Sequence, residues 1–419
     1  MIYLPALFFG ICTLLSIKKY GWTIQSFGFS LYFITGIASI QIDQFHLYQY
    51  NCLKKPLGIL APISYCLLLF IFIKPLGAIF RPDLLKKIKV SNVKYLDYIV
   101  YFFFGLFLYD VFVSYQNMGN ILVNNTFAEI RQSAYSGDLE SFYNHLSGIP
   151  RYIAALSTFF FASSFFLICV FFYNITYRNV KWYFHIMTIC GSMLQLLSSI
   201  SQADRSQFLY WFIVFLFCYT LFRPVMPIKR QIKLLFAVLP ILGVIVVYFV
   251  LVSISRWGES SNGTEGGTFI YAGQNFINYC NFVNELWNTP RSLCEIFPFT
   301  YHILGERSYF DWAHIVTKAS GMYIAVFPSF LGLIFSISGP IVLIIYTIVY
   351  RMFCFKWLQR SSYKEANFMD ISKCFILSLV SVLGVFGYFY MSYTATMAIF
   401  FWLFIGYKVS KKQISKKQK

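Results

Sequence analysis

Long apolar runs alternate with short polar connections along most of the chain. A helix needs about 20 mostly apolar residues to cross a bilayer, where it satisfies its own backbone hydrogen bonds. The pattern predicts an all-α polytopic integral membrane protein, with residues 1–419 as a single transmembrane domain. We expect eleven crossings, at 2–17, 22–42, 57–80, 95–115, 151–174, 182–201, 206–222, 233–254, 322–350, 370–388 and 391–408.

Two of these runs leave the count open between ten and twelve. The second run is polar, and the ninth is overlong and interrupted by Pro328 and by Gly339-Pro340. A removable signal peptide is the competing interpretation of residues 2–17. Because no basic start precedes this run and no small-residue cleavage site follows it, we interpret it as the first crossing.

Composition agrees with this fold class. Hydrophobic residues make up 58% of the chain and charged residues 12%, against about half and a quarter in soluble domains. The formal charge is +18. In a membrane protein we attribute it to topology rather than to nucleic-acid binding, since lysine and arginine accumulate in cytoplasmic loops. We therefore expect the lipid bilayer, and no nucleic acid, as a partner.

Basic residues also predict the orientation. One alternating set of connections holds 24 of the 34 lysines and arginines, including six lysines from Lys408 to Lys419. We assign this side to the cytoplasm, which places the amino terminus outside and the carboxyl terminus inside. Lys54 and Lys55 depart from the pattern, because they fall in a predicted outer connection.

The outer side carries the two long connections, residues 116–150 and 255–321, in which we expect short interfacial helices. Its basic residues are six arginines and one lysine: Arg131, Arg151, Arg205, Arg256, Arg291, Arg307 and Lys318. Guanidinium grips phosphate or carboxylate in a planar, bidentate way, so the set favours an anion site. The alternative is that each arginine pairs with an acid of the same connections.

Three of these arginines have informative neighbours. Asp204 and Arg205 share a short turn at the predicted outer boundary, where an ionisable pair suggests function or simple mutual neutralisation. Arg131 lies among apolar residues at helical spacing and is predicted on an interfacial helix. Arg256 lies where the eighth crossing ends, at the depth of a lipid diphosphate.

The stretch that follows Arg256 alternates glycines, aromatic rings and amides. Ring faces and amide pairs match the apolar patches and hydroxyls of a glycan, which predicts sugar contacts for Tyr271, Gln274, Asn275 and Asn278. A flexible glycine linker and an aromatic membrane belt are the alternatives.

Several chemical signatures are missing from the sequence. It holds no Walker A, H-E-x-x-H or G-x-S-x-G motif, and no metal-ligand spacing, so we expect no cofactor and no metal. His314 is a candidate proton carrier, with a solvated surface histidine as the alternative.

The layout from the fourth crossing onward resembles the Wzy-type O-antigen and oligosaccharide repeat-unit polymerases. The resemblance rests on "EIRQSAYSG" in the first long connection, "ADRSQFL" at the seventh crossing and "SRWGESSNGTEGGTFIYAGQNFINYCNF" in the second. It implies an enzyme of surface polysaccharide (O-antigen or capsule) biosynthesis, a glycosyltransferase-type polymerase. Such an enzyme joins undecaprenyl-diphosphate-linked oligosaccharide units at the outer face of the membrane. A chain-length regulator and a flippase of the same pathway would be further partners.

Carried onto this chain, the family's two loop arginines fall on Arg131 and Arg256. An R-x9-G pattern is met by Arg256 and Gly266, whereas R-x15-G from Arg131 meets Ser147, with Gly148 next to it. Where the family often has an Asp-Phe-Gly-like trio, this chain has Phe330-Leu331-Gly332. These departures leave the subfamily open.

The resemblance and the residues together predict a set of roles. Arg256 and Arg131 would clamp the leaving diphosphate, with Arg205 as a third cation and Arg291 as a further substrate contact. Glu259 is the carboxylate nearest to Arg256 in the sequence and our candidate base, with Asp204 and His314 as rivals. A ligase that uses the same donor, and a flippase or exporter of lipid-linked oligosaccharide, are the rival functions.

Overall fold

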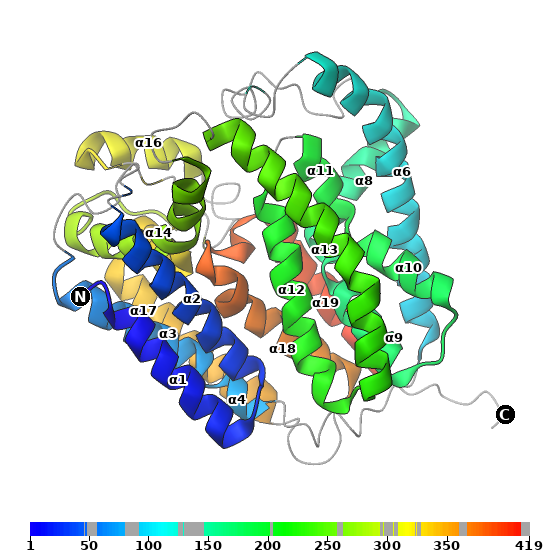
Figure 1. Ribbon diagram of the computed structural model, residues 1–419, viewed down its shortest axis with the longest axis horizontal. Coiled ribbons are helices and arrows are strands. Elements are labelled where there is room, and N and C mark those ends of the chain that lie inside the picture. Colours follow the sequence, from blue (N-terminus) through cyan, green and yellow to red (C-terminus); the bar gives the residue numbers. More distant parts are fainter. Residues whose placement is uncertain are drawn as a thin grey trace. The chain divides into compact units, whose positions relative to one another are not determined.

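The described residues are mostly helical (Figure 1). The chain divides into two compact units. The computed structural model describes residues 1–45, 47, 57–79, 92–124, 129, 146–201, 204–257, 263–293, 296, 305, 309–322, 324, 328–359 and 367–411. The first unit comprises Met1–Leu84, Glu265–Glu365 and Lys373–Thr396, and the second comprises Leu85–Thr264, Ala366–Ser372 and Met397–Lys419.

The helices of the first unit come from both halves of the sequence. They are α1 (Leu4–Tyr20), α2 (Ile24–Gln44), α3 (Leu60–Ile73), α4 (Leu76–Ile79), most of α14 (Gly263–Glu285), α16 (Tyr309–Ser320), α17 (Ser329–Gln359), most of α18 (Phe368–Val382), η3 (Leu383–Val385), η4 (Phe389–Met391) and the start of α19 (Tyr393–Ser410).

The second unit is built mainly from the middle of the chain. Its helices are α6 (Lys94–Asn124), α8 (Ile149–Ser164), α9 (Phe166–Tyr177), α10 (Trp182–Ser192), α11 (Leu194–Ser201), α12 (Ser206–Phe222), η1 (Arg223–Val225) and α13 (Ile228–Trp257), with the first turn of α18 and most of α19.

Four of the described helices are long and apolar enough to cross a membrane. They are Lys94–Ser114, Ser206–Val225, Ser329–Lys356 and Phe368–Val385. The pairs α8 with α9 and α10 with α11 are bent by 58° and 48°, and would raise the number to six if each pair is one crossing. The all-helical class is confirmed and the protein is a membrane protein, whereas the count of eleven crossings stays a prediction.

Exposed apolar stripes fit a lipid environment. On α1, Leu7, Ile11 and Leu14 recur at helical spacing, and all three are exposed. On α17, Ile341, Ile344 and Ile348 form a second such stripe. Contiguous exposed apolar surface is unfavourable in water but costs nothing against lipid tails.

Small residues bring helix backbones together in the first unit. A Cβ on Gly36 of α2 would lie 2.8 Å from the backbone nitrogen of Ala6 in α1. A Cβ on Gly273 of α14 would lie 2.5 Å from the backbone of Ala38 and Ser39 in α2, and the Ser39 hydroxyl donates to the Gly273 carbonyl oxygen at 2.7 Å. Close approach through small residues, with a hydroxyl bond across the contact, is typical packing for helices in membranes.

The core of the second unit is aromatic, and several of its polar groups pair with one another. The Trp211 indole donates to the Ser192 hydroxyl at 3.0 Å, and the Trp402 indole donates to the Ser163 carbonyl oxygen at 3.0 Å. The Asp110 carboxylate of α6, which is 1% exposed, accepts the Ser157 hydroxyl of α8 at 2.5 Å. These bonds satisfy donors that no water could reach inside a bilayer.

The predicted interruption of the ninth apolar run is confirmed at Gly339. This residue has φ 86° inside α17, and Pro340 follows it. The predicted start at residue 322 is wrong for the helix itself, since α17 begins at Ser329, directly after Pro328. A proline disfavours the helical conformation of the residue before it, so the helix begins beyond Pro328.

Candidate functional site

Helix α13 is continuous from Ile228 to Trp257 and carries Arg256 in its last turn. At about 1.5 Å per residue, Lys229 and Arg256 are separated by roughly 40 Å along the helix axis. This separation exceeds the hydrocarbon thickness of a bilayer, which is about 30 Å. The two basic residues therefore lie near opposite ends of a helix long enough to cross.

The turn between α11 and α12 is built around Asp204. Its carboxylate accepts the Ser206 backbone N–H at 3.0 Å and the Ser206 hydroxyl at 2.8 Å. The Asp204 backbone N–H in turn donates to the Ser199 carbonyl oxygen at 2.9 Å. The carboxylate thus satisfies an orphan donor in the first turn of α12, where negative charge also favours the helix dipole.

Arg205 follows in the same turn and is 1% exposed. Removing a guanidinium from water is costly unless acceptors or opposite charge surround it. The predicted site arginine at this boundary is thus enclosed by protein in the structure.

Tyr248 connects this turn to α13. Its hydroxyl lies 3.5 Å from the carbonyl oxygen of Asp204, and its ring lies 4.7 Å from the ring of Phe208, centroid to centroid. Arg256 comes eight residues after Tyr248, about 12 Å further along the helix axis. The structure therefore brings Asp204, Arg205 and the last turns of α13 to one end of the second unit.

Two predicted catalytic residues, Arg131 and Glu259, lie outside the described residues. The side chain of Arg256 is likewise not described, so α13 fixes only the position of its backbone. The clamp formed by Arg131 and Arg256 stays a prediction.

Residues 263–285, predicted as part of a loop, form helix α14. Gly266 and Gly267 lie within this helix, so these two glycines do not form a flexible linker. Helix propensity is a weak prior, and tertiary packing overrides the cost of about 1 kcal/mol per glycine. Here the burial of the α14 side chains outweighs that cost.

The amides of α14 lie within the protein. Gln274, Asn275 and Asn278 are at most 5% exposed, while Tyr271 is half-buried. The Asn275 side chain donates to the Val385 carbonyl oxygen at 2.9 Å, and the Asn278 amide lies 3.5 Å from the Gln274 side-chain oxygen. The amide of Asn275 thus holds the end of η3 against α14, and the predicted glycan contacts of this helix stay a prediction.

Arg291 lies beside the break in α17. Its Nη1 donates to the carbonyl oxygens of Phe335 at 3.0 Å and Ser336 at 3.4 Å. Its Nη2 donates to the carbonyl oxygens of Leu286 at 2.5 Å and Trp287 at 3.1 Å, just beyond the end of α14. Burial lowers the pKa of this guanidinium, although arginine keeps its proton at neutral pH.

The chemistry of the break explains these contacts. In a regular helix the residues at 339 and 340 would donate to the carbonyl oxygens of Phe335 and Ser336. Gly339 is not helical and Pro340 has no N–H, so both oxygens lose these partners. Arg291 replaces them, and its predicted role as a substrate contact stays a prediction.

Helix α16 is a short amphipathic helix in the second long connection. Trp312, Ala313 and Val316 are buried, whereas His314 and Lys318 are exposed. This pattern fits the short interfacial helix expected in the connection. His314 is open to solvent, as either interpretation of it requires.

The contacts that join distant segments leave no signal in the local sequence. Tyr248 carried no signal beyond its aromatic character, and the Asn275–Val385 pair spans 110 residues. Among the described residues, no three histidine, cysteine, aspartate or glutamate side chains are grouped as a metal site. Comparisons with protein-family models, curated proteins and solved structures find no match for this chain.

Proposed function

We propose that this membrane protein is a polymerase that joins lipid-diphosphate-linked oligosaccharide units into a surface polysaccharide at the outer face of a bacterial cytoplasmic membrane. The observation that carries the proposal is the contact between Tyr248 of α13 and the Asp204 turn. It sets Arg205 and the helix turn bearing Arg256 at the same end of one unit, opposite the basic residues Arg223 and Lys229.

The reaction needs a cationic clamp more than it needs covalent catalysis. The hydroxyl oxygen of an acceptor sugar attacks the anomeric carbon of the donor, and the bond from that carbon to the phosphate oxygen breaks. The diphosphate leaves with the electron pair, and the hydroxyl proton passes to a base. Guanidinium groups placed where negative charge develops on the leaving group would lower the barrier.

Each predicted residue has a role in this scheme. Arg256 and Arg131 bind the diphosphate, and Arg205 adds positive charge from within the protein. Glu259 takes the proton, with Asp204 and His314 as the rival bases. The proposal for Arg256 rests on its position in α13 and on the resemblance to repeat-unit polymerases.

The test uses the full-length protein reconstituted in liposomes with a defined undecaprenyl-diphosphate-linked repeat unit. We expect a ladder of products from the native protein and a loss of at least about 100-fold in rate from Arg256→Lys, because lysine keeps the charge but not the bidentate geometry. Arg351→Lys, at an exposed position on α17, is the matched control and should retain the ladder. Full activity of the Arg256→Lys variant would refute the clamp.

The same preparation separates the rival functions. A ligase would transfer a finished chain to a lipid acceptor without making a ladder. A flippase would move the donor across the liposome membrane without changing it chemically. Either result in place of a ladder would overturn the polymerase proposal.

A further inference from the structure

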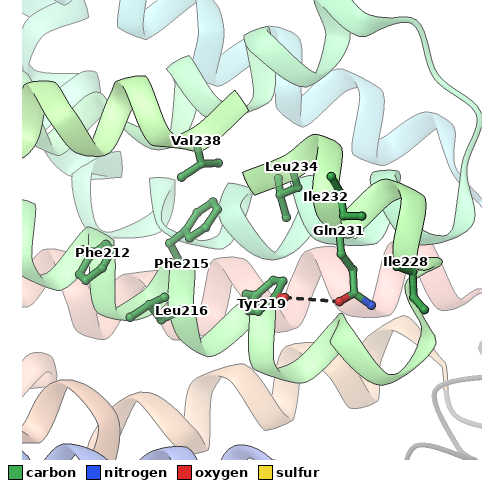
Figure 2. Close-up of a pocket in the computed structure, with 9 residues that line it drawn as sticks. All are labelled: Phe212, Phe215, Leu216, Tyr219, Ile228, Gln231, Ile232, Leu234 and Val238. Carbon is green, nitrogen blue, oxygen red and sulfur yellow. Dashed lines mark hydrogen bonds between the residues drawn. The ribbon is translucent and has the colours of Figure 1, made fainter. Parts of the chain in front are cut away.

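An apolar pocket lies between α12 and α13, at the end of the second unit opposite Arg205. Its volume is about 310 Å³, at the lower end of the range for small-molecule sites. Figure 2 shows the nine side chains that line it, which come from α12 and from the first three turns of α13: Phe212, Phe215, Leu216, Tyr219, Ile228, Gln231, Ile232, Leu234 and Val238.

The polar groups of the pocket are bonded within the protein. The Tyr219 hydroxyl donates to the Gln231 side-chain oxygen at 3.4 Å (Figure 2). The Gln231 amide nitrogen donates to the carbonyl oxygens of Arg223 at 3.2 Å and Met226 at 2.8 Å. These bonds occupy the polar groups of Gln231 and Tyr219, so the wall presented to an occupant is hydrocarbon and aromatic.

The rim of the pocket opens to the surroundings of the protein. Ile228 is 74% exposed and Ile232 is 52% exposed, whereas Leu234 and Val238 on the inner wall are buried. An apolar pocket with an exposed apolar rim suits a hydrocarbon chain, and α12 belongs to a segment long and apolar enough to cross a membrane. A hydrocarbon chain can enter it sideways from the bilayer without crossing water.

Positive charge surrounds the same end of the helix pair. Arg223 in η1, and Lys229 and Lys233 in the first turns of α13, are exposed. Arg230 faces inward, and its guanidinium donates to the carbonyl oxygens of Ile175 and Thr176 at the end of α9. Exposed basic side chains at a membrane surface each favour an anionic headgroup by about 1 kcal/mol.

We propose that this pocket holds one acyl chain of an anionic phospholipid, whose phosphate is bound by Arg223, Lys229 and Lys233. The occupant is a bilayer lipid of the leaflet on the basic side of the membrane. The site lies at the opposite end of α12 from Arg205, so it does not depend on the proposed reaction.

The charge component is tested with full-length protein in detergent, titrated with phosphatidylglycerol or phosphatidylcholine and followed by native mass spectrometry. We expect phosphatidylglycerol to bind at least about 10-fold more tightly than phosphatidylcholine. The triple variant Arg223→Gln, Lys229→Gln, Lys233→Gln should lose this preference. Its matched control, Lys18→Gln, Lys19→Gln, Lys94→Gln, removes the same charge from exposed positions elsewhere and should keep it.

The pocket component is tested by filling it. Val238→Trp places an indole in the cavity and should reduce phosphatidylglycerol binding to the level of the charge variant. Phe236→Trp is the control, since Phe236 lies two residues away on α13 and is 69% exposed. Equal binding of both lipids by the native protein, or unchanged binding by Val238→Trp, would overturn the proposal.

A third measurement leaves the three basic residues and the inner wall of the pocket unchanged. A photoreactive phenylalanine analogue at Ile232, on the exposed rim, should crosslink to phosphatidylglycerol in mixed liposomes. The same analogue at Phe236 should crosslink to each lipid in proportion to its abundance. Crosslinks at Ile232 that follow lipid abundance alone would contradict a specific site.

Discussion

The guanidinium of Arg291 donates to the carbonyl oxygen of Phe335 across 3.0 Å, where α17 is broken at Gly339. The same side chain holds the chain segment that follows α14, through the carbonyl oxygens of Leu286 and Trp287. A further hydrogen bond joins the same two segments: the Ser338 hydroxyl donates to the Ser292 carbonyl oxygen at 2.6 Å. One arginine thus joins the end of one helix to the interruption of another.

We predict that Arg291→Met lowers the thermal midpoint of the purified protein. The substitution keeps most of the apolar stem but removes the guanidinium donor from the carbonyl oxygens of Phe335, Ser336 and Trp287. The Leu286 carbonyl oxygen keeps the Thr289 hydroxyl as a donor, and we expect a cost of about 1–3 kcal/mol. Thermal unfolding in detergent measures the effect. Arg351→Met, at an exposed position on α17, is the control. Equal midpoints for the two variants would show that the Arg291 contacts contribute nothing.

Gly273→Ala should destabilise the contact between α14 and α2. The added methyl group would lie 2.5 Å from backbone atoms of Ala38 and Ser39, which cannot move as a flexible side chain can. We expect a loss of about 1–3 kcal/mol. Gly105→Ala is the matched control, because nothing lies within 4 Å of a Cβ built there, and alanine should leave stability unchanged or improve it.

Ser157→Ala should destabilise the second unit by about 1–3 kcal/mol, because it removes a donor from the buried carboxylate of Asp110. Thr158→Ala is the neighbouring control. The Thr158 hydroxyl bonds only to the Ala154 carbonyl oxygen one turn earlier in the same helix, so its loss should change the midpoint little. Equal unfolding temperatures for the two variants would show that the hydrogen bond from Ser157 to Asp110 does not stabilise the protein.

Variants of Asp204 separate a structural role from a catalytic one. Asp204→Ala removes the acceptor of the Ser206 N–H and should cost about 1 kcal/mol. Asp204→Asn keeps an acceptor and should cost only a few tenths. If Asp204 is the base, Asp204→Asn should also abolish ladder formation while remaining folded; retained activity would leave Glu259 and His314 as the candidates.

The predicted orientation is open to a labelling test. In a background without native cysteines, His314→Cys on the exposed face of α16 should react with an impermeant maleimide in intact spheroplasts. Lys18→Cys and Lys411→Cys should react only after permeabilisation, because they belong to the basic side. The reverse pattern would invert the topology and place Arg256 on the cytoplasmic side.

Properties set by short segments could be predicted from the sequence. The apolar run flanked by Lys229 and Arg256 predicted the helix now seen as α13, since transfer from water to hydrocarbon depends on the residues themselves. The Gly339-Pro340 pair predicted a break for an equally local reason, because proline has no N–H to donate. The predicted turn at Asp204 and Arg205 likewise lies between two helices.

Tertiary structure alone decided which polar groups meet. Glycines and amides between 263 and 285 suggested a loop, yet these residues form a helix whose side chains are largely buried. Gly273 packs against the backbone of α2, where a Cβ would clash, and Asn275 donates to the carbonyl oxygen of Val385. The guanidinium of Arg291 donates to the carbonyl oxygen of Phe335, 44 residues later in the chain. A hydrogen-bond partner that far along the chain leaves no mark in the local pattern, because the free energy of the bond depends on a distance that only the folded chain defines.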